Sequence, residues 1–348
     1  MAEIDFAMGV VIGTQNAEGD INSVVSGATT IDDFAAGGGD PIAGGVLGDP
    51  ESGIGESGLE VEWTREQRDR AVVSGSLTAQ QGEFLREAVE AFTVGWVLKG
   101  SGSGTFAADA DHRLQPGPEA LLAGMGLPGG AWGSGVGWRH APGAAVPLTV
   151  ALFVGPLKWV FQDCTASGSI EFTPAGLAVV QSQIEVGSVA SFASLGSFPG
   201  TVDYGAQATL AAPVVQGVAH TWGALRGFTS LLLGFDNAIE ELEDSNAATG
   251  IRARPTARTI TAEVTMWADD ADDDFERANL IDTSPPTDLL NFTVGTIASA
   301  PANAFEARLT NPQALSLKPT RLQDKLGWEL VLQAVDAAAN GEFELIFQ

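Results

Sequence analysis

Three patterns in this sequence use residue types that carry out chemistry in other proteins. The three histidines, His112, His140 and His220, lie in unrelated contexts and lack the i, i+4 spacing of a helical zinc site. GIGESG (53–58) matches a dinucleotide-binding loop, but it precedes a predicted strand instead of following one. DDADDD (269–274) resembles the start of a calcium loop, yet it lacks the required glycine and the closing glutamate. We therefore expect no enzyme, no cofactor and no metal site.

The remaining reactive groups are one cysteine and many carboxylates. A lone cysteine, Cys164, excludes an internal disulfide framework, and its place between predicted strands favours a buried hydrophobic role over a reactive thiol. No two carboxylates are singled out as a glycosidase pair, so an acidic hydrolase is only a third-ranked alternative.

The charge balance excludes proteins that grip nucleic acid. The chain has 44 acidic residues against 17 Lys and Arg, a formal net charge of −27. Tight binding to phosphate depends on counterion release by Lys and Arg, which are scarce here. The acidity suits either a surface that repels DNA or a saline habitat.

The composition and hydrophobic pattern predict a mainly β protein. The 43 glycines and 17 prolines leave room for few long helices. Residues 59–63, 92–99 and 258–267 alternate apolar and polar side chains, as half-buried strands do. A short helix is expected at 116–127, where a proline lies near the start and glycines near the end. The longest apolar stretch (146–161) is too short and too interrupted to cross a bilayer, so we expect no membrane insertion.

The chain also repeats a short pattern. Ile170, Phe172 and Pro174 match Leu315, Leu317 and Pro319, about 145 residues later, and each set is followed by another alternating stretch. The order of predicted elements (strand, short helix, two strands, motif) is the same in both halves. We therefore predict a glycine-rich N-terminal arm (1–58) that needs neighbours to order it, then two similar domains at 59–198 and 199–348 joined by a linker at 190–205.

The second half, from Ala248 onward, resembles the tail tube proteins of tailed phages. In that family a strand ending in glycine, a strand before a proline, a turn into an alternating strand and a final strand occur in this order. Here the corresponding segments are Val294–Gly295, Leu315–Pro319, Leu326–Gly327 and Phe343–Phe347, preceded by a short helix at Phe275–Ile281. The turn departs from the family pattern, because Leu326 stands where an acidic residue would precede the glycine.

The resemblance implies two tandem tail-tube-type β-barrel or sandwich domains, each with a short helix. Three such chains would make a pseudo-sixfold ring, and stacked rings would form the virion tail tube that conducts DNA during ejection. The partners implied are other copies, the tail terminator, the tape measure and the distal tail or baseplate proteins, with assembly in the host cytoplasm.

Two groups of residues are predicted to act in such a tube. The first would line the bore and repel phosphate: Glu60, Glu62, Glu185, Glu263 and Glu329. The second lies in the segment 64–90, expected to be a loop that reaches the next ring or a surface helix, and is mixed in sign: Arg65, Glu66, Arg68, Asp69, Arg70, Glu83, Arg86 and Glu87.

Two alternative functions remain open from the sequence. A baseplate hub or distal tail protein would use similar domains but would stop at one ring. A β-sandwich adhesin or carbohydrate binder would use exposed aromatic residues, and the chain has eight tryptophans but only one tyrosine.

Overall fold

A computed structural model gives the fold, and it describes most but not all of the chain. The described residues are 8–17, 19–28, 59–61, 64–71, 80–88, 91–98, 108–114, 116–172, 178–195, 215–220, 223–224, 228–243, 251–268, 289–294, 305–310, 312–335 and 342–347. The expected helix at Phe275–Ile281, the acidic run at 269–274 and Glu62 lie outside them.

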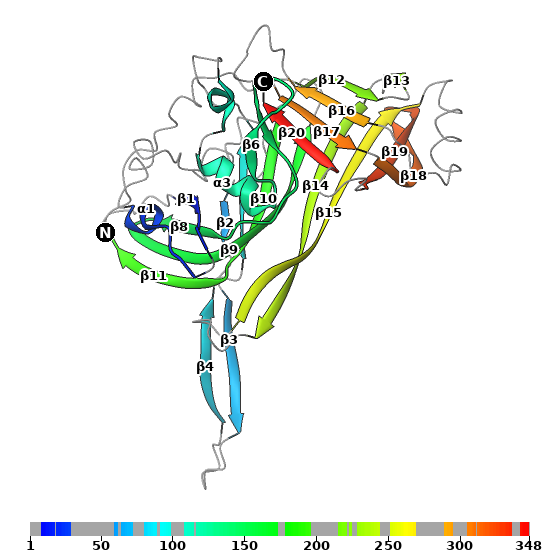
Figure 1. Ribbon diagram of the computed structural model, residues 1–348. Coiled ribbons are helices and arrows are strands. Elements are labelled where there is room, and N and C mark those ends of the chain that lie inside the picture. Colours follow the sequence, from blue (N-terminus) through cyan, green and yellow to red (C-terminus); the bar gives the residue numbers. More distant parts are fainter. Residues whose placement is uncertain are drawn as a thin grey trace.

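The described part of the chain is mainly β, with two large antiparallel sheets (Figure 1). Eight strands of the first sheet form one continuous path in the order β18-β19-β15-β14-β9-β10-β5-β2. All of these neighbours are antiparallel. Their bounds are β18 Pro312–Leu322, β19 Lys325–Ala334, β15 Ile251–Trp267, β14 Phe228–Glu243, β9 Leu157–Phe172, β10 Ala178–Glu185, β5 Ala91–Val97 and β2 Leu59–Val61.

The same sheet has a branch at the long strand β9. The N-terminal part of β9 pairs with β8 (Leu148–Val154) and β11 (Ser188–Ser194), and β8 pairs in turn with β1 (Met8–Thr14). The C-terminal part of β9 pairs with β10 and β14 instead. Asp163, with a φ of 53°, stands between the two parts, next to an irregularity in the β8–β9 register. One strand therefore passes from one set of neighbours to another.

The second large sheet has the order β13-β12-β16-β17-β20-β7-β6. It takes strands from both halves of the sequence, because β20 pairs with β7. The bounds are β13 Gly223–Ala224, β12 Val215–His220, β16 Leu289–Val294, β17 Phe305–Thr310, β20 Phe343–Phe347, β7 Trp138–His140 and β6 Gly129–Ala131.

The hydrophobic core lies between the two sheets and beneath the helix α3 (Pro116–Gly124). This helix was expected at 116–127 from its proline and glycines. Aromatic rings join the layers. The Phe172 ring on β9 lies 6.0 Å from Phe305 on β17, and the Phe235 ring on β14 lies 4.9 Å from Phe343 on β20. One face of the eight-strand path is thus covered.

The same pairing order occurs twice along the chain. β9-β10-β5-β2 in the first half corresponds to β18-β19-β15-β14 in the second. β1-β8-β9-β11 likewise corresponds to β12-β16-β17-β20. Both sheets cross the expected boundary at residue 198, since β9 pairs with β14 and β7 with β20. The two sets of strands therefore share one core.

Three sequence-based expectations about the fold need correction. Residues 8–28 of the expected arm pack within the chain, because Val10, Ile12 and Val25 are buried and β1 pairs with β8. A short helix, α1 (Ser23–Gly27), follows β1. The expected linker at 190–205 begins with most of strand β11.

Of the two prolines of the repeated motif, Pro319 lies within β18 opposite Trp328, and Pro174 lies outside the described residues. The third correction concerns the turn expected at Leu326–Gly327, which lies earlier, at Gln323 and Asp324, where φ is 45° and 68°.

Candidate functional site

The uncovered face of the eight-strand path is polar, because its strands alternate. Every second residue of these strands points into the core, including Phe172, Val180, Leu233 and Val264. On β5, β9, β10, β14 and β15 the residues between them point to the other face, and the exposed ones are polar with the exception of Ala257: Thr93, Glu171, Gln181, Gln183, Asp236, Thr259 and Glu263. The result is a mainly polar surface that crosses the joint between β9 and β14.

The structure places most of the predicted bore residues on this polar face. Glu263 on β15 is exposed. Glu185, the last residue of β10, and Glu329 on β19 are partly buried. Glu329 lies 3.5 Å from the ammonium group of Lys318 on β18. Glu60 occupies the corresponding phase of β2, opposite Thr93. Three of the five predicted glutamates, Glu185, Glu263 and Glu329, therefore share one face of one sheet.

Two further acidic residues on this face were missed by the sequence analysis. Glu171 on β9 and Asp236 on β14 are both exposed. Leu232 lies between Glu171 and Glu263 in the strand register, so these two carboxylates flank one apolar side chain. The signal was present, because Glu171 stands between Ile170 and Phe172 and Asp236 follows Phe235.

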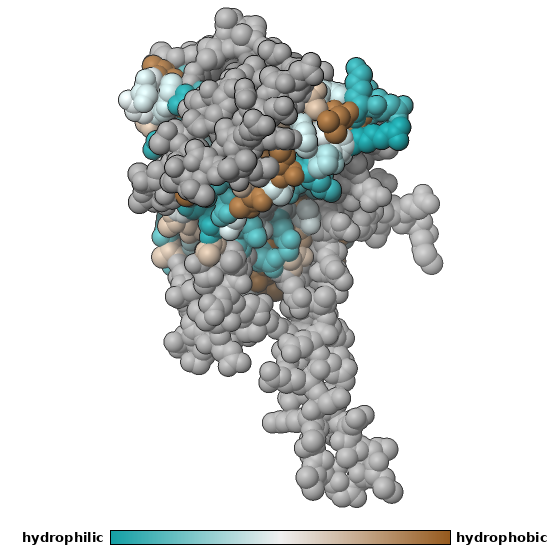
Figure 2. Space-filling model, turned by 90° about the vertical axis from the view of Figure 1, so that its right-hand side faces the viewer, coloured by the Kyte–Doolittle hydropathy of each residue, from teal (hydrophilic) through white to brown (hydrophobic). Residues whose placement is uncertain are grey.

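The path ends at two strands that have no further partner among the described strands, β18 and β2. β18 carries features that limit uncontrolled pairing: Pro319 and Lys318 within it, and a register shift at Leu315. Leu315 is nonetheless 57% exposed, and Leu326 at the start of β19 is 55% exposed. Figure 2, which faces this side of the molecule, shows apolar side chains beside hydrophilic ones.

The segment predicted as a loop or surface helix is instead a β-hairpin, formed by β3 (Thr64–Ala71) and β4 (Gln80–Ala88). Figure 1 shows it projecting away from the two sheets. Its charged residues stand at neighbouring positions without a two-residue period, so the sequence carried no clear strand pattern here.

The hairpin register places opposite charges across from each other. Arg65 pairs with Glu87, Glu66 with Arg86, and Arg68 with Glu83. Opposite charges in directly paired positions stabilise a hairpin by about 0.2–1 kcal/mol for each pair. The remaining predicted members, Asp69 and Arg70, face the uncharged Gly82 and Gln81. Six of the eight residues predicted to reach the next ring thus occupy paired positions of opposite sign in the hairpin register.

A largely buried arginine joins the two halves beside the β9–β14 joint. Arg258 on β15 donates to Glu342 at 2.7 Å and to the carbonyl oxygens of Gly143 at 2.8 Å and Gly126 at 3.3 Å. The amide of Asn237 on β14 donates to the carbonyls of Met125 and Ala166. Residues of the second half thereby satisfy backbone carbonyls of the first.

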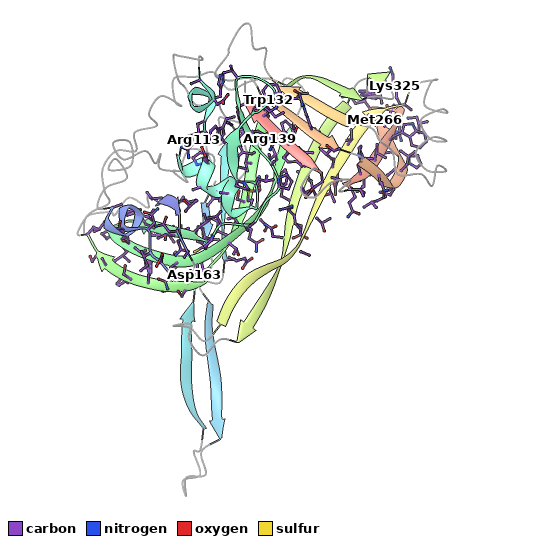
Figure 3. All side chains as sticks on the ribbon, in the orientation of Figure 1. Arg113, Trp132, Arg139, Asp163, Met266 and Lys325 are labelled. Atoms are coloured by element: carbon purple, nitrogen blue, oxygen red, sulfur yellow. The ribbon has the colours of Figure 1, made fainter. Side chains whose placement is uncertain are left out.

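A second contact between the halves lies at β7, where His140 is completely buried. Its Nδ1 lies 3.0 Å from the carbonyl oxygen of Leu127, and its ring meets the edge of Phe347 on β20. Burial lowers the pKa of His140 to about 4. Nearby, burial raises the pKa of Glu119, although its ion pair with Arg113 at 2.9 Å partly opposes this. Figure 3 shows Arg113 and Arg139 in this region.

The other candidate reactive groups are structural or lie apart. Cys164 is buried, as predicted, and burial raises the pKa of its thiol to about 12. Within the described residues there is no group of three His, Cys, Asp or Glu side chains that could hold a metal ion. No helix in the same part of the chain is long and apolar enough to cross a membrane.

No protein-family model matches this chain, and no curated protein matches it significantly.

Proposed function

We propose that this chain is the structural subunit of a phage tail tube, in which three copies form a ring and rings stack into a hollow conduit for DNA. The observation that carries the proposal is the repeated strand order, with one free strand at each end of the path. It is supported by the resemblance of the second half to tail tube proteins.

The pairing inside the chain serves as a template for pairing between chains. β14, the last strand of one four-strand unit, pairs antiparallel with β9, the first strand of the other. β2 is the last strand of its unit and β18 the first strand of its own, and neither has a further partner among the described strands. Repeating the internal joint between copies therefore pairs β2 of one chain antiparallel with β18 of the next. Head-to-tail contacts of this kind close into rings and leave no sheet edge.

Three copies follow from the number of units in each chain. The resemblance implies six tube domains in a ring, and three doubled chains supply six. Three eight-strand paths would give a barrel of about 24 strands, wide enough for an aqueous channel. The covered face, packed against the second sheet and α3, would form the outer wall of this barrel.

The polar face would line the bore. Glu171, Asp236 and Glu263 are exposed there, and the predicted Glu185 and Glu329 share the face. Carboxylates repel the phosphates of passing DNA, and the scarcity of Lys and Arg avoids contacts that would retard it. The acidic face is thus suited to a conduit that must not bind its cargo.

The β3–β4 hairpin is proposed to contact the adjacent ring, and the tail terminator, tape measure and distal tail proteins would bind at the ends of the tube. The subunit would be assembled in the host cytoplasm and would act in the virion tail, without catalysis. Residues 8–28 would not form an intersubunit arm, because they pack on their own chain.

Electron microscopy of the purified full chain tests the proposal directly. We expect rings with threefold symmetry that stack into filaments. A particle that stays monomeric at high concentration would contradict the proposal, true sixfold symmetry would contradict the doubled-domain ring, and single unstacked rings would indicate a hub instead.

The lining role has its own test. Replacing Glu60, Glu62, Glu185, Glu263 and Glu329 together by Gln should leave ring assembly intact and slow DNA ejection at low salt, where electrostatic effects are largest. Asp20→Asn, which neutralises an exposed carboxylate elsewhere, is the control. If ejection by the fivefold variant matches that of the wild type, these residues do not act in the bore.

A further inference from the structure

Strand β11 is a second kind of free edge, outside the eight-strand path. It pairs with β9 on one side, and no described strand pairs with its other side. It contains no charged residue and no proline, the usual devices that protect an edge. Val189 and Phe192 on it are 42% and 57% exposed, and the Phe192 ring lies 5.0 Å from that of Trp159 on β9. An unprotected apolar edge of this kind is suited to strand addition.

The equivalent edge in the second half is covered. β20 holds the position in the order β12-β16-β17-β20 that β11 holds in β1-β8-β9-β11. β7 pairs with the far side of β20, with Ile346 opposite Arg139. Arg139 also donates to Glu344 at 2.8 Å. The strand that covers β20 comes from the first half of the chain.

The covering strand therefore reaches across the joint between the two units. β9 of the first half is paired with β14 of the second, and on the other side of the core the first half also supplies β7 to β20. The first half is joined through its first strand, β9, to the last strand of the second half, β14. The same half also supplies β7 to the outer sheet of the second half.

We propose that β11 is completed by the second half of an adjacent copy of this chain, which adds a strand along β11 and buries Val189 and Phe192. This inference rests on the proposed ring, in which β2 of one chain is joined to β18 of the next. In that joint, the second half of the adjacent copy lies beside the first half of this chain. The arrangement is the same as that within one chain, where the first half lies beside the second. Each subunit contact then comprises two strand additions, one at the bore and one at the outer wall.

A thiol-protection experiment on the full chain tests the outer contact. Ser191→Cys introduces an exposed thiol on β11, while the native Cys164 is buried and unreactive. Ring and monomer fractions are separated by size, and each is labelled with a maleimide. We expect labelling in the ring to be at least about tenfold slower than in the monomer, because the added strand shields the site.

The outcomes separate this inference from the proposed function. If rings form but Ser191→Cys reacts equally fast in ring and monomer, the ring stands and the β11 contact is wrong. If the thiol is already protected in the monomer, another part of the same chain covers β11, and the inference is also wrong. If no ring forms at all, both proposals fail.

A charge variant gives a second measure. Phe192→Lys should weaken ring formation by about tenfold or more, since it places a charge at the centre of the proposed contact. Val136→Lys, at a comparably exposed apolar position, is the matched control and should assemble normally. Both variants should melt like the wild type as monomers, because the replaced side chains are exposed. Equal assembly of both variants would overturn the β11 contact.

Discussion

The two halves of this chain have the same strand order but treat their edges differently. In the second half the outer edge, β20, is covered by β7 from the first half, whereas no described strand covers the outer edge of the first half, β11. The first half also runs β9 as one strand of 16 residues, while the second divides the same path into β17 and β18. The difference shows which contacts the chain makes by itself and which it leaves open.

The largest effect is expected at Arg258, whose hydrogen bonds to Gly126 and Gly143 join the halves. Arg258→Met leaves the largely buried Glu342 without its ion-pair partner and the carbonyl of Gly143 without this donor, so the free energy of unfolding should fall by about 3–5 kcal/mol. Arg321→Met is the control, because its pair with Asp324 is exposed and should contribute less than about 1 kcal/mol. Urea unfolding measures both.

The same experiment tests how strongly the halves are coupled. Because they share one core, we expect a single transition by fluorescence and by circular dichroism. Two separate transitions, with Arg258→Met affecting only the second half, would mean that the halves are independent domains.

The second effect concerns pH and the β7–β20 contact. Burial lowers the pKa of His140 from 6.5 to about 4, so the unfolded state binds more protons between these values. Stability contributed by neutral His140 is complete above about pH 6.5 and is lost as the pH falls toward 4, by about 3 kcal/mol in all. The raised pKa of Glu119 acts in the opposite sense, because its stability contribution is lost as the pH rises.

His140→Gln separates these two contributions. Glutamine does not titrate, and its amide can still donate to Leu127, so the variant should have a flatter stability curve between pH 6.5 and 4. An unchanged slope would assign the pH dependence to other groups.

The smallest effect is expected at the β18–β19 turn, which holds two of the three non-glycine residues with positive φ in the described part of the chain. Gln323 and Asp324 form the two-residue turn of the β18–β19 hairpin, where Asn-Gly is preferred. Gln323→Asn with Asp324→Gly should therefore stabilise the protein by about 1 kcal/mol in thermal or urea unfolding.

Asp163 provides the contrast in the first half. It also has a positive φ, but its carboxylate accepts a hydrogen bond from the backbone N–H of Gly19 at 2.8 Å, whereas the carboxylate of Asp324 makes an exposed ion pair with Arg321. Asp163→Gly would lose that bond and should not stabilise. Equal stabilisation at both sites would show that backbone strain alone decides the effect.

The faces of the strands could be predicted from the sequence, because alternation was clear. Ile260, Ala262, Val264 and Met266 are buried as expected, and the polar residues between them include Glu263 on the open face. Three of the predicted glutamates reached a common face because each stood between apolar neighbours.

The pairing of strands could not be predicted in the same way. The sequence has no turn residue at Asp163, where β9 changes its neighbours, because the strand continues through this position. The change depends on close packing against Gly187, where a Cβ would come within 2.3 Å of the carbonyl oxygen of Asp163. The hairpin at 64–88 was missed because its strands carry charges of both signs at neighbouring positions. Apolar and polar residues therefore do not alternate there as they do in a half-buried strand.

The β3–β4 hairpin has a consequence for how rings would dock. The first half breaks its path into a separate charged hairpin, whereas the second half continues β14 and β15 as one long hairpin. A ring of three chains would then present two kinds of protrusion in alternation around its rim. Orientations of the next ring would then be equivalent only every third of a turn. Six identical protrusions would instead make them equivalent every sixth of a turn, so the twist between rings would follow the number of chains and not the number of domains.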